Sequence, residues 1–234
     1  MQKILGIIVA RKGSKGLKNK NIKKINGKPL IYWSIKQAKK SKLLTRLIVN
    51  TDSTKVIQIA KKLNVEVPFR RPRELSTSQS LIFKTLKYTI NFFKKRNIFF
   101  KYIALIEPTS PLREKNDIDK ILNFFFKKKI KSLVTMGKVV CQHPDFLFKL
   151  SNDNKLLPFT NFESASSRRQ NIRDLYFPDG TLYVSDVKTL LKKKSFYHEQ
   201  TYGFVLPKWK NIEIDDQLDF DIAEMLMKKN ISSL

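Results

Sequence analysis

Residues 4–21, ILGIIVA followed by RKGSKGLKNKN, join an apolar run of seven residues to a segment with two glycines, five basic side chains and no acid. A short continuous apolar run is typical of a strand buried on both faces of a sheet. Gly13 and Gly16 allow the backbone that follows to turn tightly and to bring its N–H groups close to an anion. The stretch therefore predicts a strand-to-helix connection that holds a di- or triphosphate, with a solvated basic turn as the alternative.

This glycine-containing loop differs from the two common phosphate-binding motifs. No Gly-Lys-Ser or Gly-Lys-Thr follows the glycines, as a Walker A loop requires, and the spacing is not that of G-x-G-x-x-G. Arg11, Lys15, Lys18 and Lys20 would neutralise the charge of a bound anion. The residue types indicate an anionic ligand but do not identify it.

Outward from this loop, apolar runs alternate with amphipathic segments. Strands are expected at residues 4–10, 47–51, 65–69, 102–106 and 132–136. Helices are expected from three apolar faces, made by Leu30, Ile31, Ile35 and Ala38, by Leu86, Ile90 and Phe93, and by Ile118, Ile121, Leu122 and Phe125. The alternation predicts an α/β fold, a Rossmann-like three-layer α/β/α arrangement with a mostly parallel sheet and its ligand loops at the carboxyl edge of the strands.

The strand–helix rhythm stops after about residue 138. Residues 139–174 carry Pro, Asn, Asp, Ser and Arg clusters with short apolar pieces, which is typical of an insertion or arm. Strand signals return at 181–184 and 202–206, and a last helix is expected from about Asp216, with Leu218, Ile222 and Met225 at helical spacing. We therefore predict a single domain, 1–234, with an arm at 139–174.

The charge balance is strongly basic, with 47 Lys and Arg against 20 Asp and Glu, a net charge of +27. Such a balance suggests nucleic acid or an anionic membrane as a partner. However, the lysines are dispersed over nearly every segment, and aromatic residues are not interleaved with them as a base-stacking surface requires. The pattern favours a bias in composition over a role in binding nucleic acid.

The compartment is indicated by cysteine usage and by the length of the apolar runs. Cys141 is the single cysteine, which excludes an internal disulfide and fits a reducing, cytoplasmic setting. The run at 4–10 is short for the core of a signal peptide, and no run reaches the length of a transmembrane helix.

Five ordered parts of the sequence resemble the acylneuraminate cytidylyltransferases, the CMP-sialic acid synthetases. They are ARKGSKGLKNKNIKKINGKPLIYWSI (10–35), VNTDS (49–53), RPRELS (71–76), EPTSPLR (107–113), and FPDGTLYV (177–184) followed by IEIDDQLDFDIAE (212–224). The resemblance covers nearly the whole chain and is weakest in the arm. It implies the nucleotide-diphospho-sugar transferase type of fold.

By this resemblance the protein would transfer CMP from CTP to the anomeric hydroxyl of an acidic nine-carbon 2-keto sugar and release pyrophosphate. Attack at the α-phosphate builds charge on phosphoryl oxygens, so catalysis would be mostly positioning and charge neutralisation. Arg11 and Lys20 would contact the triphosphate. The nucleotide-binding residues implied are Arg11, Gly13, Ser14, Lys15, Gly16, Lys20, Asn21, Arg71, Ser78 and Ser80. The last two lie in STSQSLIFK, which departs from the family's usual Asp-Thr-containing run.

The resemblance also implies Mg²⁺, with Mn²⁺ as a substitute, held by Asp215 and Glu213. Residues two apart on a strand face the same way, so both carboxylates can serve one site. The alternative for Asp215 and Asp216 is capping of the last helix. Glu107 stands where sialic acid synthetases carry Gln, and it is either a third metal ligand, a contact to the sugar, or the ion-pair partner of Arg113.

The sugar-side residues implied are Glu107, Thr109, Ser110, Arg169, Gln170 and Tyr183. Arg169 could hold the substrate carboxylate through two hydrogen bonds, although Arg168 and Arg173 are close in sequence. His143, His198 and Cys141 lack the surroundings of catalytic groups or metal ligands.

Family members pair through an extension at the place of the arm, and the apolar residues of HPDFLFKL (143–150) have no partner in the main rhythm. A homodimer is therefore expected, with each arm reaching toward the partner's sugar site. Two other functions stay open: a synthetase for Kdo or amino-Kdo, and a basic nucleic-acid-binding protein.

Overall fold

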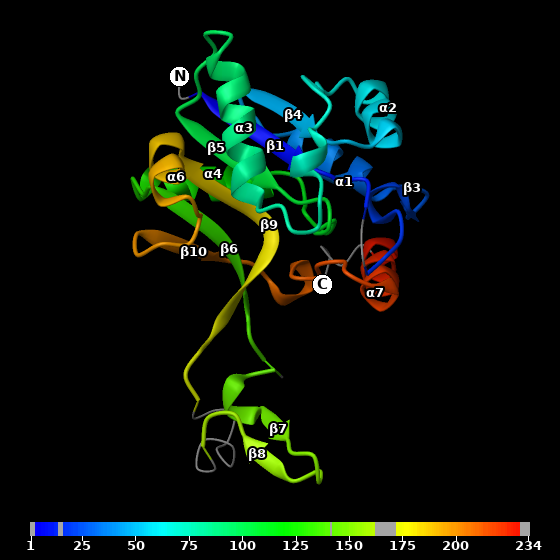
Figure 1. Ribbon diagram of the computed structural model, residues 1–234, viewed down its shortest axis with the longest axis vertical. Coiled ribbons are helices and arrows are strands. Elements are labelled where there is room, and N and C mark those ends of the chain that lie inside the picture. The colour runs from blue at the N-terminus through cyan, green and yellow to red at the C-terminus, as the bar shows by residue number, and fades with distance from the viewer. Residues whose placement is uncertain (1–2, 14–15, 141, 162–171, 230–234) are drawn as a thin grey trace.

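A computed structural model describes residues 3–13, 16–140, 142–161 and 172–229. Its body is a six-stranded sheet in the order β10-β6-β9-β5-β1-β4 (Figure 1). Strand β1 pairs in parallel with β4 and β5, and β6 with β10, while β9 runs antiparallel between β5 and β6. The strands are β1 Ile4–Val9, β4 Arg46–Asn50, β5 Tyr102–Ile106, β6 Ser132–Lys138, β9 Tyr176–Asp186 and β10 Thr201–Val205.

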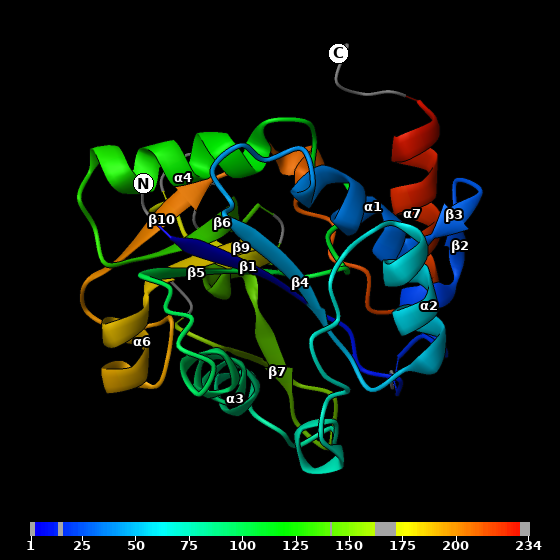
Figure 2. The ribbon, with the colours of Figure 1, turned by 90° about the horizontal axis from the view of Figure 1, so that it is seen from above.

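Helices cover both faces of this sheet, as Figure 2 shows. One face carries α1 (Leu30–Ala38), α2 (Thr54–Lys62) and α4 (Asp117–Lys127), whose apolar residues pack in one buried cluster with β1 and β4. The other face carries α3 (Ile82–Lys94) and α6 (Val187–Lys193) in a second cluster. The predicted three-layer α/β/α fold with a mostly parallel sheet is confirmed.

One local prediction was wrong. Residues 65–69 form no strand: a single isolated bridge joins Glu66 to Ile48 of β4, and Pro68 lacks the N–H that a longer ladder needs. On the last helix, α7 (Gln217–Lys228), Leu218 and Met225 are exposed, whereas Phe220 and Ala223 are buried. Helix α7 turns this other face to a separate small core around the hairpin of β2 (Lys24–Ile25) and β3 (Lys28–Pro29).

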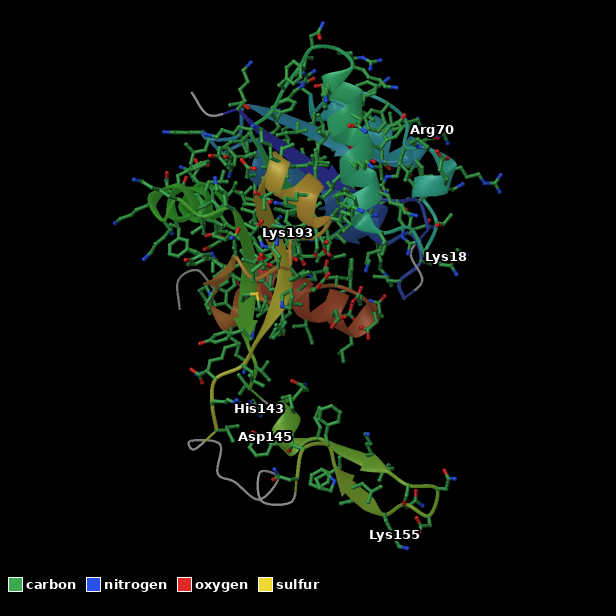
Figure 3. All side chains as sticks on the ribbon, turned by 60° about the vertical axis from the view of Figure 1, so that its left-hand side comes forward. Lys18, Arg70, His143, Asp145, Lys155 and Lys193 are labelled. Atoms are coloured by element: carbon green, nitrogen blue, oxygen red, sulfur yellow. The ribbon has the colours of Figure 1, made fainter. Side chains whose placement is uncertain are left out.

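The arm leaves the body where β6 and β9 continue together beyond the sheet (Figure 1). It holds a 3₁₀ turn, Pro144–Phe146, and a hairpin of β7 (Phe148–Leu150) and β8 (Leu156–Pro158). Figure 3 places His143 and Asp145 near its base and Lys155 at its far end. The His143 ring is buried and hydrogen-bonds the carbonyl of Arg173 at 3.1 Å, as a structural histidine would.

Three further 3₁₀ turns border the loops, at Lys20–Ile22, Arg73–Leu75 and Lys208–Lys210. Within the described ranges, no helix combines the length and apolar character needed to span a bilayer.

Candidate active site

A cleft of about 350 Å³ opens at the carboxyl ends of β1 and β5. It brings together eleven of the residues expected from the sequence: Arg11, Gly13, Gly16, Lys20, Asn21, Arg71, Ser78, Ser80, Glu107, Thr109 and Asp215. Parallel strands present their carboxyl ends at one edge, so loops distant in sequence meet there. Ser14, Lys15, Arg169 and Gln170 lie outside the described residues.

The basic loop after β1 is fastened to the segment before α7. Lys20 Nζ donates to Asp215 Oδ1 at 2.8 Å and to the carbonyl of Ile214 at 2.6 Å. The Lys20 side chain is 12% exposed and that of Asp215 is 79% exposed, so the pair has one buried and one open member. Gly16 packs so close to the carbonyl of Asp215 that a Cβ there would overlap it. The basic loop therefore contacts Asp215 twice, through the Asp215 side chain at Lys20 and through the Asp215 carbonyl at Gly16.

The far wall of the cleft holds an ordered arginine and an unpaired hydroxyl. Buried Arg71 donates to Asn50 Oδ1 at 2.5 Å and to the Asn50 carbonyl, at the end of β4. Burial lowers the pKa of Arg71 to about 10, so it stays charged. The buried hydroxyl of Ser80 finds no partner among the described residues. Because buried polar atoms are normally hydrogen-bonded, this hydroxyl indicates room for a polar ligand group.

On the other side of the cleft, Glu107 meets Glu213, which does not itself line the cleft. Burial, followed by the charge of Glu213, raises the pKa of Glu107 to about 8, and the two side chains hydrogen-bond each other. Burial also raises the pKa of Glu213, which accepts from Thr109 Oγ1 at 3.2 Å. Two facing carboxyl groups with raised pKa values share a proton when no cation is present.

Arg113 does not form the ion pair with the Glu107 carboxylate that was one alternative. Its Nη2 donates instead to the backbone carbonyls of Glu107 at 3.1 Å and Thr181 at 2.7 Å. Its Nη1 donates to Ser34 Oγ at 3.1 Å. Arg113 is buried and holds the loop after β5 against β9, which leaves the Glu107 carboxylate to the cleft.

A bulge in β9, which the sequence analysis did not single out, supports the glutamates from behind. Gly180 has φ +71°, and a Cβ there would lie 2.8 Å from Ser110 Oγ and 3.2 Å from Glu107 Oε2. Buried Asp179 accepts from the Thr135 hydroxyl at 2.5 Å and the Thr181 amide at 2.9 Å. Burial raises the pKa of Asp179. The Asp-Gly pair in FPDGTLYV is a turn signal that could have marked this bulge.

The sequence of residues 5–232 matches the family model described as Cytidylyltransferase. The chain belongs to the cytidylyltransferase family. It is similar to the N-acylneuraminate cytidylyltransferase of Streptococcus agalactiae serotype V, with 31% identity over 92% of this chain and 51% of that protein. It is also similar to the CMP-N,N'-diacetyllegionaminic acid synthase of Legionella pneumophila, with 30% identity over 99% of each chain. The pseudaminic acid cytidylyltransferase of Campylobacter jejuni is 28% identical over 99% of each chain.

The chain spans about half the length of the N-acylneuraminate cytidylyltransferases it matches and nearly all of the legionaminic and pseudaminic relatives. The same fold occurs in a solved structure of CMP:2-keto-3-deoxy-manno-octonic acid synthetase complexed with CTP. That structure has a TM-score of 0.69 and 13% identity, and the match covers 98% of this chain and 100% of that one.

Two of the residues predicted to bind the sugar do not line the cleft. Ser110 is 1% exposed and donates to the carbonyl of Asp179 at 2.9 Å, so it fixes the bulge. Tyr183 is half-buried and packs on Phe196 and Tyr197, with ring centroids 5.4 and 6.3 Å away. Burial and the charge of Glu107 raise the pKa of Tyr183, which places its hydroxyl near the acids.

The carboxylates at the cleft are of the chemical type that binds a hard cation. Among the described residues, no three His, Cys, Asp or Glu side chains are grouped as a metal site. Asp215 faces Lys20, and Asp216, whose side chain accepts from the Asp219 amide at 3.0 Å, is the helix cap. Mg²⁺ in nucleotide sites needs only one or two protein carboxylates besides phosphate. The proton-sharing Glu107 and Glu213 fit that requirement, because a cation can take the place of their proton.

Proposed function

We propose that this cytidylyltransferase transfers CMP from CTP to the anomeric hydroxyl of an acidic nine-carbon 2-keto sugar for surface glycan biosynthesis. The cleft carries the proposal, because it joins a basic glycine loop, a polar wall with an unpaired Ser80 hydroxyl and a pair of glutamates. The names of the relatives, which include sialic, legionaminic and pseudaminic acid enzymes, support a sugar of this class.

The residues around the cleft divide into three groups in this mechanism. Ser78, Ser80 and the Arg71 wall receive the cytidine. Arg11 and Lys20, with the backbone at Gly13 and Gly16, neutralise the phosphates while charge moves onto the leaving pyrophosphate. Thr109 and the glutamates lie on the side from which the sugar hydroxyl attacks.

Mg²⁺, for which Mn²⁺ would substitute, belongs to the same proposal. Glu107 and Glu213 would hold it, and Asp215 would join them once phosphate draws Lys20 away. When bound, the cation neutralises charge on the phosphoryl oxygens. The alternative role of Glu107 is a contact to the sugar. A magnesium titration distinguishes a metal ligand from a sugar contact.

The arm supports a symmetric homodimer. Its large apolar side chains are exposed, with Leu150 at 67%, Leu156 at 58% and Phe159 at 56%. A contiguous exposed apolar surface on a projecting hairpin is typical of an interface. We place this dimer in the cytoplasm, where the single Cys141 stays reduced.

A pyrophosphate-release screen tests the function. The purified protein is incubated with CTP, Mg²⁺ and a panel of 2-keto sugar acids that includes Kdo, and UTP and ATP replace CTP in parallel. The proposal expects CTP-dependent release with a nine-carbon acid and none in excess chelator. Equal turnover with UTP or ATP contradicts it, and preference for Kdo selects the alternative substrate.

The basic character of the chain is tested by salt. A nucleic-acid-binding protein loses affinity for a DNA or RNA probe steeply as salt rises, since each phosphate contact releases a counterion. CTP held in a cleft by a few groups loses affinity much less. Tight, salt-sensitive binding of the probe without CTP turnover would favour the nucleic-acid alternative.

A further inference from the structure

A second cavity, of about 240 Å³, adjoins the nucleotide cleft. Arg11 and Asn21 line both spaces, and the Asn21 side chain donates to the Arg11 carbonyl at 3.1 Å. The cleft and the cavity therefore share these two residues. The cavity is lined by Arg11, Lys12, Asn19, Asn21, Ile22, Ser53, Thr54, Lys55, Val56 and Arg70.

Among the described residues, the lining of this cavity contains four cations and no acid. Within the described part of the chain, Arg11, Lys12, Lys55 and Arg70 form no ion pair with an acidic side chain. Asp52 is the nearby acid, but its Oδ1 accepts from the Lys12 amide at 2.7 Å, and it does not line the cavity. The positive charge is left to attract an anion from solvent.

The backbone around the cavity is held in place. Arg70 Nε donates to the Asp52 carbonyl at 3.2 Å, and the Arg71 amide donates to the Thr51 carbonyl at 2.8 Å. The Ser53 side chain caps α2 through the Val56 amide. Arg70 lies on the same flank of the body as Lys18 (Figure 3). These bonds fix the segment after β4, and the bond from the Lys12 amide to Asp52 Oδ1 joins that segment to the loop after β1.

The order of the strands places the cavity opposite the sugar side. Neighbouring strands run β5, β1, β4 along the sheet. Glu107 follows β5, Arg11 follows β1, and Ser53 follows β4. Glu107 and Thr109 line the cleft but not the cavity, whereas Ser53 and Lys55 line the cavity but not the cleft. The Arg11 loop thus stands between the sugar side and the cavity.

We propose that this cavity receives the pyrophosphate leaving group, an inference that rests on the proposed function. In phosphoryl transfer the attacking and leaving oxygens lie roughly in line across the phosphorus. A sugar hydroxyl that attacks from the Glu107 side forms the new C–O–P bond. The bond from the α-phosphorus to the bridging oxygen breaks, its electron pair stays on pyrophosphate, and the sugar hydroxyl gives its proton to a water molecule in the cleft. The departing diphosphate therefore moves toward β4 and the cavity.

The lining suits a small polyanion better than it suits the cytidine or the sugar. Ile22 and Val56 are its apolar residues, and it has no aromatic ring on which a cytosine could stack. Asn19, Ser53 and Thr54 add polar groups to the four cations. Charge-assisted hydrogen bonds from several cations are the usual means of holding phosphate.

Pyrophosphate binding to the full-length protein tests the assignment without turnover. Isothermal titration with inorganic pyrophosphate and Mg²⁺ compares wild type with Lys55→Ala/Arg70→Ala. The matched control is Lys61→Ala/Lys62→Ala, which removes the same charge from the other end of α2, outside the cavity. CMP binding is measured in each protein to report whether the nucleotide cleft is intact.

The cavity variant is expected to bind pyrophosphate about tenfold or more weakly, because each lost charge-assisted hydrogen bond weakens binding by about that factor. Its affinity for CMP should stay within about twofold of wild type. The control should match wild type for both ligands, and thermal unfolding should show all three proteins folded.

Equal weakening in the control would mean that general charge, not the cavity, binds pyrophosphate, and unchanged binding in the cavity variant would overturn the assignment. The proposed function fails separately. If no 2-keto sugar acid is activated, yet the cavity variant alone loses pyrophosphate, a diphosphate site stands without the reaction. If a sugar is activated and the cavity variant binds pyrophosphate normally, the inference fails alone.

Discussion

Gly16→Ala should separate the two halves of the active site. A Cβ at Gly16 would overlap the backbone oxygen of Asp215, far inside the 3.4 Å at which ordinary van der Waals contact begins. The clash is with backbone, so no side-chain rotation relieves it. The neighbouring residues Leu17 and Ile214 are buried in one small core, and the Ile214 amide is bonded to the Thr109 carbonyl at 2.8 Å. Neither segment can move alone.

Relief of this overlap requires the loop and the acid segment to part by about 1 Å. A misplacement of that size costs about a hundredfold in rate when it separates groups that act on one reacting centre. Lys20 and Asp215 are such groups, since their contact joins the same two segments, the loop after β1 and the segment before α7. The overpacking should also lower the free energy of unfolding by about 1–3 kcal/mol.

Gly13→Ala is the matched control in the same loop. The nearest atom to a Cβ there is Arg11 Nη1 at 3.8 Å, and neither glycine has a positive φ among the described residues. The assay is kcat/KM for CTP by pyrophosphate release, with thermal unfolding in parallel. Gly13→Ala should remain within about threefold of wild type. Equal activity of the two variants would refute the reasoning.

Four other outcomes follow from the site and the arm. Asp215→Asn should lower kcat about a hundredfold or more, while unfolding changes by less than about 1 kcal/mol because the carboxylate is exposed; unchanged kinetics would mean that the active site is misplaced. Glu107→Gln should raise the magnesium requirement with every sugar if Glu107 is a ligand, and should alter only sugar preference if it reads the sugar. In metal-free buffer, between about pH 4.5 and pH 8, the folded protein binds more protons at Glu107 than the unfolded chain does. The free energy of unfolding, measured by urea denaturation, should therefore fall as pH rises through this range. Glu107→Gln should make this free energy less dependent on pH. Light scattering at micromolar concentration should find a dimer that Leu150→Glu/Leu157→Glu converts to monomer, with Lys155→Glu as control; a monomeric wild type would refute the dimer.

The alternation of apolar runs and amphipathic faces was enough to predict the layers of the fold, because periodicity reports burial directly. It was not enough to predict that β9 runs antiparallel between β5 and β6, since a buried strand reads the same in either direction. It predicted the last helix, but not which face of that helix is buried. Leu218 and Met225 have helical spacing, but the face that packs is set by the β2–β3 hairpin, whose position no local pattern encodes.

For the cleft, sequence motifs supplied the residue types but not their partners. Lys20 and Asp215 are 195 residues apart, and their contact depends on the whole sheet. Arg113 and Ser110 were expected to face the acids or the sugar, yet both hold backbone carbonyls instead. A polar side chain in a motif can serve the ligand or the loop that presents it, and the spacing of residues does not distinguish these roles.

The charged groups at the cleft are paired with one another. Lys20 is paired with Asp215, and the Glu107 side chain hydrogen-bonds Glu213. A triphosphate competes with Asp215 for Lys20, and a divalent cation competes with the proton between the glutamates. The two exchanges support each other. When phosphate takes Lys20, the released Asp215 can approach the cation, and the bound cation in turn offsets the charge of the phosphate. For this reason Asp215→Asn, which removes only one charge from an exposed side chain, is expected to weaken the use of CTP and of magnesium together.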